Sequence, residues 1–159
     1  MSERIDVRAL EVQLDPIERL RVLARALPGS GMREATIDAP FDAVWRAATD
    51  IEGVIPQVEP FVRRAQIVRR DDERVQAIVK SPLLPAMQME VLVRPGWCVM
   101  QTRMGMAAWA ARPDGDRTRL AHLEAFRFPG KRLLGPLLRL KMRLVRELRG
   151  VERAAQTLE

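Results

Sequence analysis

The spacing of hydrophobic positions along the chain changes from helical to strand-like near Val62 and becomes helical again toward the C-terminus. Before Val62, apolar residues recur every three or four positions in two short segments, 16–27 and 40–50. Asp15 and Pro16 suit the start of the first segment, and Pro28 and Gly29 suit its end. Each segment predicts a short amphipathic helix, residues 32–40 predict a strand, and the proline-containing stretch 51–61 predicts at most a brief helical turn.

Apolar and polar residues alternate from Val62 to residue 128, as expected for half-buried strands. Val75, Ala77 and Val79 show this alternation. Turn-forming residues interrupt it at 71–73, 81–85, 94–96 and 112–116. The pattern predicts six strands joined by short antiparallel hairpins, at about 62–70, 74–81, 87–94, 97–104, 106–112 and 117–128.

The C-terminal segment predicts one long helix. Its apolar stripe consists of Leu137, Leu140, Leu144, Leu148, Val151, Ala155 and Leu158. A helix of roughly 22 residues would be about 33 Å long at 1.5 Å per residue. Because it has one apolar face, it should lie against the sheet, which makes the fold α+β.

The length and composition indicate a folded chain with one main domain. The 159 residues are 47% hydrophobic and 30% charged, which excludes a disordered protein. We expect residues 1–31 to form an N-terminal extension and residues 32–159 to form the domain. No apolar run is long enough to cross a bilayer, and the N-terminus lacks a signal-peptide pattern, so we expect a cytoplasmic location. A single cysteine, Cys98, excludes an intrachain disulfide.

The net charge of +6 is concentrated in one segment. Residues 131–149 contain seven basic residues and one acidic residue, Glu147, which accounts for the whole excess. These cations could be the solvated back of a core helix. Alternatively, they could dock on an anionic membrane or on RNA; no DNA binding is expected. The residues expected at a membrane surface are Arg139, Lys141, Arg143, Arg146 and Arg149.

Two stretches carry a resemblance to a known family. "ATIDAPFDAVWRAATDIEGVIPQVEPF" (35–61) and "AAWAARPDGDRTRLAHLEAF" (107–126) resemble patterns of the START-type helix-grip superfamily. This superfamily includes birch-pollen-allergen-like proteins, polyketide cyclases/dehydrases and lipid-transport proteins. The sequence departs from the pattern after Asp50, where Ile55 and Pro56 stand in place of a frequent tryptophan.

The resemblance implies a curved antiparallel sheet of about seven strands wrapped around the long C-terminal helix, with two short helices after the first strand. It also implies an apolar cavity between the sheet and that helix. Members bind lipids, sterols, polyketides or quinones, and some catalyse cyclisation or dehydration. The fold by itself does not choose among these functions.

His122, the only histidine, lies two residues before Glu124 in the last predicted strand. Strand alternation places both residues on one face with Leu120 and Phe126. Arginines 117, 119 and 127 mark the opposite face as solvent-exposed, so His122 and Glu124 should face the concave side. They could form an acid–base pair or polar anchor there, or simply satisfy each other or Arg103 within an apolar wall.

Other chemistries have little support in the sequence. With one histidine and one cysteine, we expect no zinc site, and no nucleotide-binding or nucleophile motif occurs, so we expect no cofactor. Trp109 could form a cavity wall or belong to an ordinary core. The alternation in 97–104 does not decide whether Met100 or Arg103 faces the cavity.

We therefore predict a protein that binds a small hydrophobic molecule. One alternative is a polyketide-type cyclase or dehydratase that uses His122 and Glu124 as acid and base. Another is a non-enzymatic adaptor that acts through the basic helix. The residues expected to contact the ligand are His122, Glu124, Leu120, Phe126, Trp109, Met89, Val91, Met100, Arg103, Leu144 and Leu148. The sequence does not determine the ligand or the oligomeric state.

Overall fold

A computed structural model of the chain describes residues 15–59, 61–82, 84–127 and 140–157. Its helices are α1 (Pro16–Ala26), α2 (Phe41–Ala48), α3 (Ile55–Val58) and α5 (Leu140–Gln156). Its strands are β1 (Gly31–Ile37), β2 (Arg64–Asp71), β3 (Arg74–Lys80), β4 (Met87–Arg94), β5 (Trp97–Thr102), β6 (Gly105–Asp114) and β7 (Arg117–Phe126).

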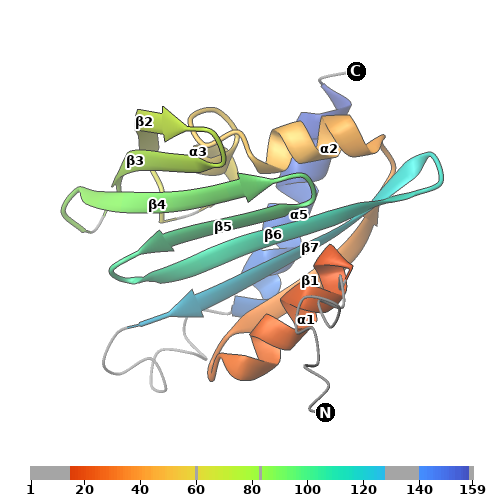
Figure 1. Cartoon of the computed structure of the whole chain (residues 1–159), viewed down its shortest axis with the longest axis horizontal. Coiled ribbons are helices and arrows are strands. Elements are labelled where there is room, and N and C mark those ends of the chain that lie inside the picture. The colour runs from red at the N-terminus through yellow and green to blue at the C-terminus, as the bar shows by residue number, and fades with distance from the viewer. Residues whose placement is uncertain (1–14, 60, 83, 128–139, 158–159) are drawn as a thin grey trace, which may run out of the picture.

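All seven strands form one antiparallel sheet in the order β1-β7-β6-β5-β4-β3-β2 (Figure 1). Strands β2 to β7 follow one another as hairpins, and β1 pairs with β7. Helix α5 lies across one face of this sheet, and α2 and α3 follow β1. The predicted α+β helix-grip fold is therefore confirmed.

The β6–β7 hairpin is longer than the sequence pattern predicted. We expected a turn at 112–116, but Pro113 pairs with Thr118, and Asp114 pairs with Arg117. The chain reverses at Gly115, whose φ of +67° is readily adopted only by glycine. Pro113 and Asp114, which we expected in the turn, therefore belong to the end of strand β6.

Apolar residues of α5 and α2 form the core on the concave face of the sheet. Leu148, Val151 and Ala155 of α5 pack in one cluster with Val44 of α2 and Leu120 of β7. Leu144 is also fully buried, as the predicted stripe requires. The stripe positions 137 and 158, and the side chain at 140, lie outside the described residues.

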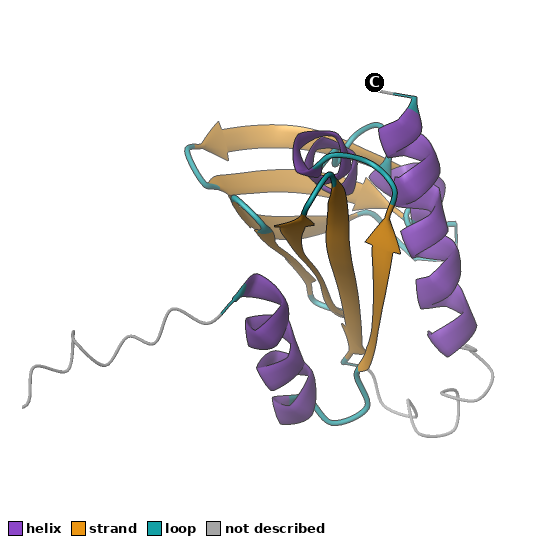
Figure 2. Ribbon diagram, turned by 90° about the vertical axis from the view of Figure 1, so that its right-hand side faces the viewer, coloured by secondary structure: helices purple, strands orange, loops and turns teal. Residues whose placement is uncertain are grey.

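Helix α1 covers the opposite, convex face of the sheet, so that α1 and α5 lie on opposite sides (Figure 2). Ile17 and Leu20 of α1 pack in one cluster with Leu123 and with alanines of β6 and β7, including Ala121. The prediction that this face of residues 117–128 is solvent-exposed was therefore wrong for its centre. Arginines 117 and 127 lie at the two ends of that face and remain exposed.

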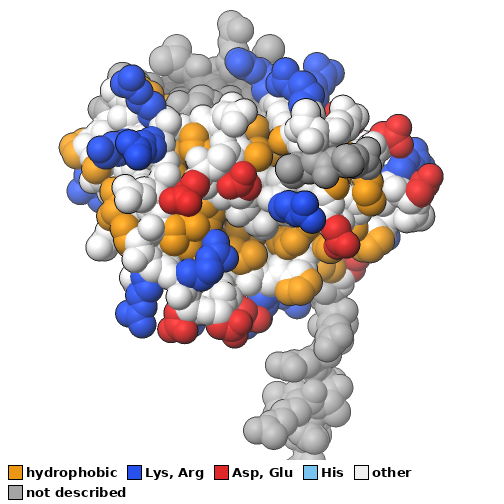
Figure 3. Space-filling model, turned by 90° about the horizontal axis from the view of Figure 1, so that it is seen from above, with side chains coloured by type: hydrophobic (Ala, Val, Ile, Leu, Met, Phe, Trp, Pro, Cys, Tyr) orange, Lys and Arg blue, Asp and Glu red, His pale blue; other side chains and the backbone are white. Residues whose placement is uncertain are grey.

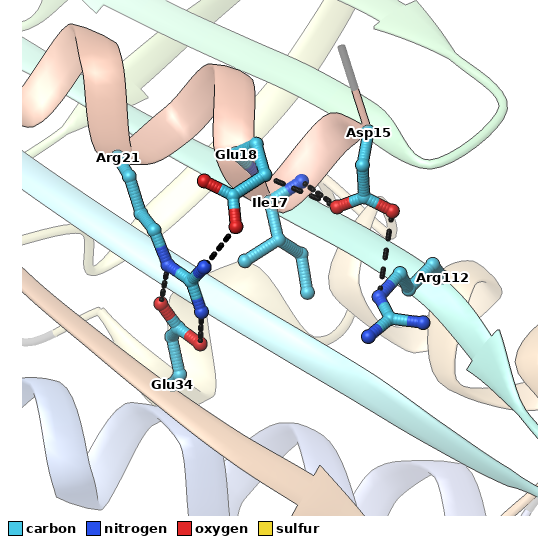
Figure 4. A network of polar contacts seen from close by, with 6 residues as sticks. All are labelled: Asp15, Ile17, Glu18, Arg21, Glu34 and Arg112. Atoms are coloured by element: carbon cyan, nitrogen blue, oxygen red, sulfur yellow. Dashed lines mark hydrogen bonds and ion pairs between the residues drawn. The ribbon is translucent and has the colours of Figure 1, made fainter.

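Polar contacts hold α1 at its N-terminus and near its middle (Figure 4). The Asp15 carboxylate accepts hydrogen bonds from the first-turn amides, including that of Ile17 at 2.9 Å, and lies 3.4 Å from Nε of Arg112. Arg21 donates two hydrogen bonds to Glu34 of β1, at 2.6 and 2.7 Å. This pairing lowers the pKa of the Glu34 carboxyl below its usual value. Helix α1 is thus attached to the sheet by its N-cap and by one bidentate pair.

Charged residues of both signs are interspersed with apolar ones on the face seen from above (Figure 3). Of the basic residues expected at a membrane, Arg146 and Arg149 are exposed, and the side chains at 139, 141 and 143 lie outside the description. Membrane docking therefore stays a prediction. Among the described residues, no helix is both long enough and apolar enough to cross a bilayer.

The packing of α1 can be tested with two substitutions on the same helix. Leu20→Ala should lower the free energy of unfolding by about 3 kcal/mol, because a fully buried side chain is removed. Val22→Ala is the matched control, since Val22 is 52% exposed, and it should change stability by less than about 0.5 kcal/mol. Urea denaturation followed by circular dichroism measures both values. Equal small effects would show that α1 does not pack on the sheet.

Candidate functional site

The centre of the site is the fully buried imidazole of His122 on β7. Its Nε2 atom lies 3.0 Å from Oε2 of Glu147 and 3.3 Å from Oε1 of Glu59. Its Nδ1 atom lies 3.1 Å from the carbonyl oxygen of Ala108 on β6. Nδ1 therefore faces a carbonyl oxygen, and Nε2 faces carboxylate oxygens. A carbonyl or an ionised carboxylate accepts hydrogen bonds but cannot donate them, so the geometry favours an imidazolium with a hydrogen on both nitrogens.

The environment of His122 sets its charge. Burial by itself would lower the pKa of the imidazole, but the contacts with Glu147 and Glu59 outweigh burial and raise the pKa to about 10. The indole ring of Trp109 stacks on the imidazole, with the ring centroids 3.7 Å apart and the planes 13° from parallel. His122 is therefore a cation at neutral pH, covered on one face by an aromatic ring.

The two carboxylates that pair with His122 come from distant parts of the chain. Glu147 is 1% exposed and lies on the buried face of α5, three residues after Leu144. Glu59 is 6% exposed and directly follows α3. Helix α3 lies close to α5 at Gly150, where an added Cβ would be 3.2 Å from Cβ of Val58. A glycine at this point lets α3 bring Glu59 to the imidazole.

Glu124 completes a compact polar group. One carboxylate oxygen each of Glu59, Glu124 and Glu147 and one ring nitrogen of His122 all lie within 4.8 Å of one another, and all four residues are buried. One imidazole and three carboxylates are also a donor set that a divalent cation accepts. The sequence argument excluded a zinc site built from cysteine and histidine; it did not anticipate carboxylates gathered from three separate elements.

A cavity of about 440 Å³ lies next to this polar group. This volume is within the usual range for sites that bind small molecules. Its walls come from strands β3 to β7 and from the chain around and after α3. The lining residues are Ile55, Glu59, Phe61, Val62, Val79, Ser81, Leu84, Met87, Met89, Met100, Thr102, Met104, Gly105, Met106, Ala107, Glu124 and Phe126. Leu84 is 37% exposed, so the cavity reaches solvent near this residue.

Four of the expected contact residues line the cavity, namely Met89, Met100, Glu124 and Phe126. The structure thereby decides the orientation of β5, because Met100 faces the cavity while Arg103 is exposed. The other expected residues do not line it: His122, Leu120, Trp109, Val91, Leu144 and Leu148 are all buried.

These expected residues do not line the cavity because α5 fills only part of the concave face. It packs on α2, β1 and β7, and there the inward side chains form a core. Within the described part of the chain, α5 contributes no residue to the cavity lining, which lies over the other strands and is closed by the α3 region. A cavity directly between sheet and long helix was the family-based expectation.

Sequence reasoning missed Glu59 and Glu147 as site residues. Glu147 gave a usable signal, because it is the one acidic residue of the basic segment and lies at helical spacing from Leu144 and Val151. Glu59 gave little signal, because it stands in an irregular stretch between Val58 and Pro60. Only the tertiary structure brings that stretch to His122.

The charge of His122 predicts a pH-dependent stability. The folded-state pKa of about 10 lies above the unfolded value of 6.5, so the folded state binds more protons between these limits. The stabilising contribution is complete below pH 6.5 and is lost as pH rises through about 10. His122→Gln should therefore lower the free energy of unfolding by about 3 kcal/mol at pH 7 and flatten its decline from pH 7 to 10.

Urea unfolding of both proteins at several pH values measures this effect. Glu90→Gln, an exposed carboxylate on β4, serves as the control and should keep the wild-type pH profile. Parallel profiles for wild type and His122→Gln between pH 7 and 10 would contradict an imidazolium at the centre of the site.

Comparisons with known proteins give a structural match but no sequence family. No model of a known protein family matches the sequence, and no curated protein matches it either. Among solved structures, the protein TTHA0849 from Thermus thermophilus is similar with a TM-score of 0.64 and 21% identity, covering 82% of this chain and 99% of that one.

Two further structures carry more descriptive names. The Zhui aromatase/cyclase from Streptomyces sp. R1128 has a TM-score of 0.59 and 16% identity, covering 80% of this chain and 93% of that one. A START superfamily protein from Mycobacterium smegmatis has a TM-score of 0.57 and 15% identity, covering 82% and 99%. At these identities the likeness shows the fold. The chain has the helix-grip fold of START superfamily proteins and aromatase/cyclases.

Proposed function

We propose that the protein binds a small hydrophobic molecule, such as a lipid, polyketide, quinone or sterol-like compound, in the cavity between strands β3 to β7 and the α3 region. The observation that carries this proposal is the cavity of about 440 Å³ with an almost wholly apolar lining. The apolar side chains around such a space lack van der Waals contacts on one side, and a bound apolar molecule would supply those contacts.

The composition of the lining supports a role in binding. Five methionines, at positions 87, 89, 100, 104 and 106, contribute to the walls. Methionine side chains are unbranched and polarisable, so they adapt to ligands of different shape. The rings of Phe61 and Phe126 pack edge to face, with their centroids 5.9 Å apart, and add rigid aromatic surface to the lining. The walls therefore combine a deformable part with a fixed part.

Filling the cavity should weaken binding strongly. Ala107 lines the cavity from β6, and Ala107→Phe would place a ring in the space that the ligand occupies. We expect wild-type protein to take up the neutral fluorophore Nile red, and Ala107→Phe to bind it at least tenfold more weakly. Ala26→Phe on the exposed end of α1 is the control and should bind as wild type does. Equal binding by all three proteins would exclude this cavity as the site.

A second candidate function is that of a polyketide-type cyclase or dehydratase. Two carboxylates, Glu59 and Glu124, line the cavity, and this chain shares its fold with the Zhui aromatase/cyclase. In such a reaction Glu124 would contact the substrate and transfer a proton. His122 lies behind the cavity wall, paired with Glu59 and Glu147, and would not contact the substrate directly. This differs from the acid–base pair expected from strand alternation.

Catalysis and simple binding predict different effects of Glu124→Gln. A binding protein should retain Nile red with less than about threefold change, because the substitution leaves the apolar walls intact. An enzyme should lose at least about 100-fold in the rate of cyclisation of a linear polyketone, followed by the absorbance of the aromatic product. Glu90→Gln is the control. The absence of any turnover by wild-type protein would remove this second candidate.

A further inference from the structure

A second cavity, of about 330 Å³, lies between the α3 region and α5. Three of its lining residues are arginines. Arg63 lies between α3 and β2, whereas Arg146 and Arg153 belong to α5. The side chains of all three are exposed. Two separate segments of the chain therefore bring guanidinium groups to one concave space.

The two arginines of α5 lie in a row with a glycine. Arg146, Gly150 and Arg153 are spaced by four and three residues, which places them on one face of the helix. At Gly150 the helix lies so close to α3 that an added Cβ would be 3.2 Å from Cβ of Val58. The glycine therefore keeps the α3 region, which leads to Arg63, close to the arginines of α5.

These arginines are not neutralised by described residues. Within the ranges that the structure describes, no carboxylate forms an ion pair with Arg63, Arg146 or Arg153. Arg153 donates one hydrogen bond, from Nε to the carbonyl oxygen of Arg149 at 3.4 Å. The charged residues of the segment 131–143 are all basic, so that segment supplies no anion for them. The guanidinium groups therefore remain available to a ligand.

Two carboxylates, Glu59 and Glu147, also belong to the lining of this second cavity. They are 6% and 1% exposed, and they lie 3.3 and 3.0 Å from Nε2 of His122. Their charge is thus partly compensated by the imidazolium, whereas the three guanidinium groups are exposed to solvent. An anion that enters from solvent therefore meets a positive surface first.

We propose that this second cavity binds a phosphate group through Arg63, Arg146 and Arg153. A guanidinium group binds phosphate or carboxylate with two parallel hydrogen bonds. Three such groups offer more donors than the roughly four acceptor positions of a carboxylate can use. A phosphate group has three terminal oxygens and a charge of about −1.5 to −2 at pH 7, so it can engage all three arginines. The site is separate from the apolar cavity, and this inference does not depend on the proposed binding of a hydrophobic molecule.

Isothermal titration calorimetry with pyrophosphate, at pH 7 and low ionic strength, tests the site in the full-length protein. Arg63→Gln, Arg146→Gln and Arg153→Gln should each weaken binding at least fivefold, because each removes charge-assisted hydrogen bonds to phosphate. Arg149→Gln is the matched control, since it removes the same charge from an exposed position of α5 that does not line the cavity. It should change the affinity less than twofold. Acetate should bind at least tenfold more weakly than pyrophosphate.

A flotation experiment distinguishes two sources of the phosphate group. Vesicles of phosphatidylcholine with and without phosphatidic acid are mixed with the wild-type protein and with the same four variants. Binding of pyrophosphate without binding to either vesicle would support a free phosphate compound as the ligand. Binding to phosphatidic acid vesicles that the three lining substitutions weaken, and Arg149→Gln does not, would support a lipid head group.

Three results would overturn the inference. The first is that neither pyrophosphate nor the phosphatidic acid vesicles bind. The second is that Arg149→Gln weakens binding as much as the lining substitutions do, because the positive charge then acts diffusely along α5. The third is that acetate binds as tightly as pyrophosphate.

Discussion

The burial of one imidazolium among carboxylates is the constraint on which the rest of this structure depends. His122 comes from β7, Glu59 from the end of α3 and Glu147 from α5, and none of these groups could be buried alone without a large desolvation cost. The ion pairs therefore require α3 and α5 to take defined positions on the sheet. The close approach of Val58 to Gly150 shows how tightly these two helices are matched.

The polar group lies at the border between a packed region and a hollow one. On one side, α5 and α2 fill the concave face with a continuous core. On the other side, the strands curve over a cavity that α5 does not enter with any described residue. Since α1 covers the convex face of β6 and β7, these central strands are supported from both sides. A sheet held in this way can keep an apolar cavity open, because its shape does not depend on packing across the cavity.

The geometry divides the chemical tasks within the site. His122 lies in the core, stacked on Trp109, and pairs with Glu59 and Glu147. Glu59 and Glu124 present oxygen atoms to the cavity, and the methionines supply adaptable apolar surface. This division applies equally to a binding protein and to an enzyme, because both need an oriented polar group in an apolar space. The fold that the chain shares with solved structures allows either function.

Local pattern alone was enough to predict the element types, the antiparallel order of β2 to β7 and the apolar stripe of α5, because hydrophobic periodicity reports which face of an element is buried. It also placed His122 and Glu124 on the concave face. Only the tertiary structure decided that His122 pairs with Glu59 and Glu147, that α1 buries Ala121 and Leu123, and that Leu144 and Leu148 lie outside the cavity lining. These outcomes depend on contacts between residues far apart in the chain, whose geometry no local pattern contains.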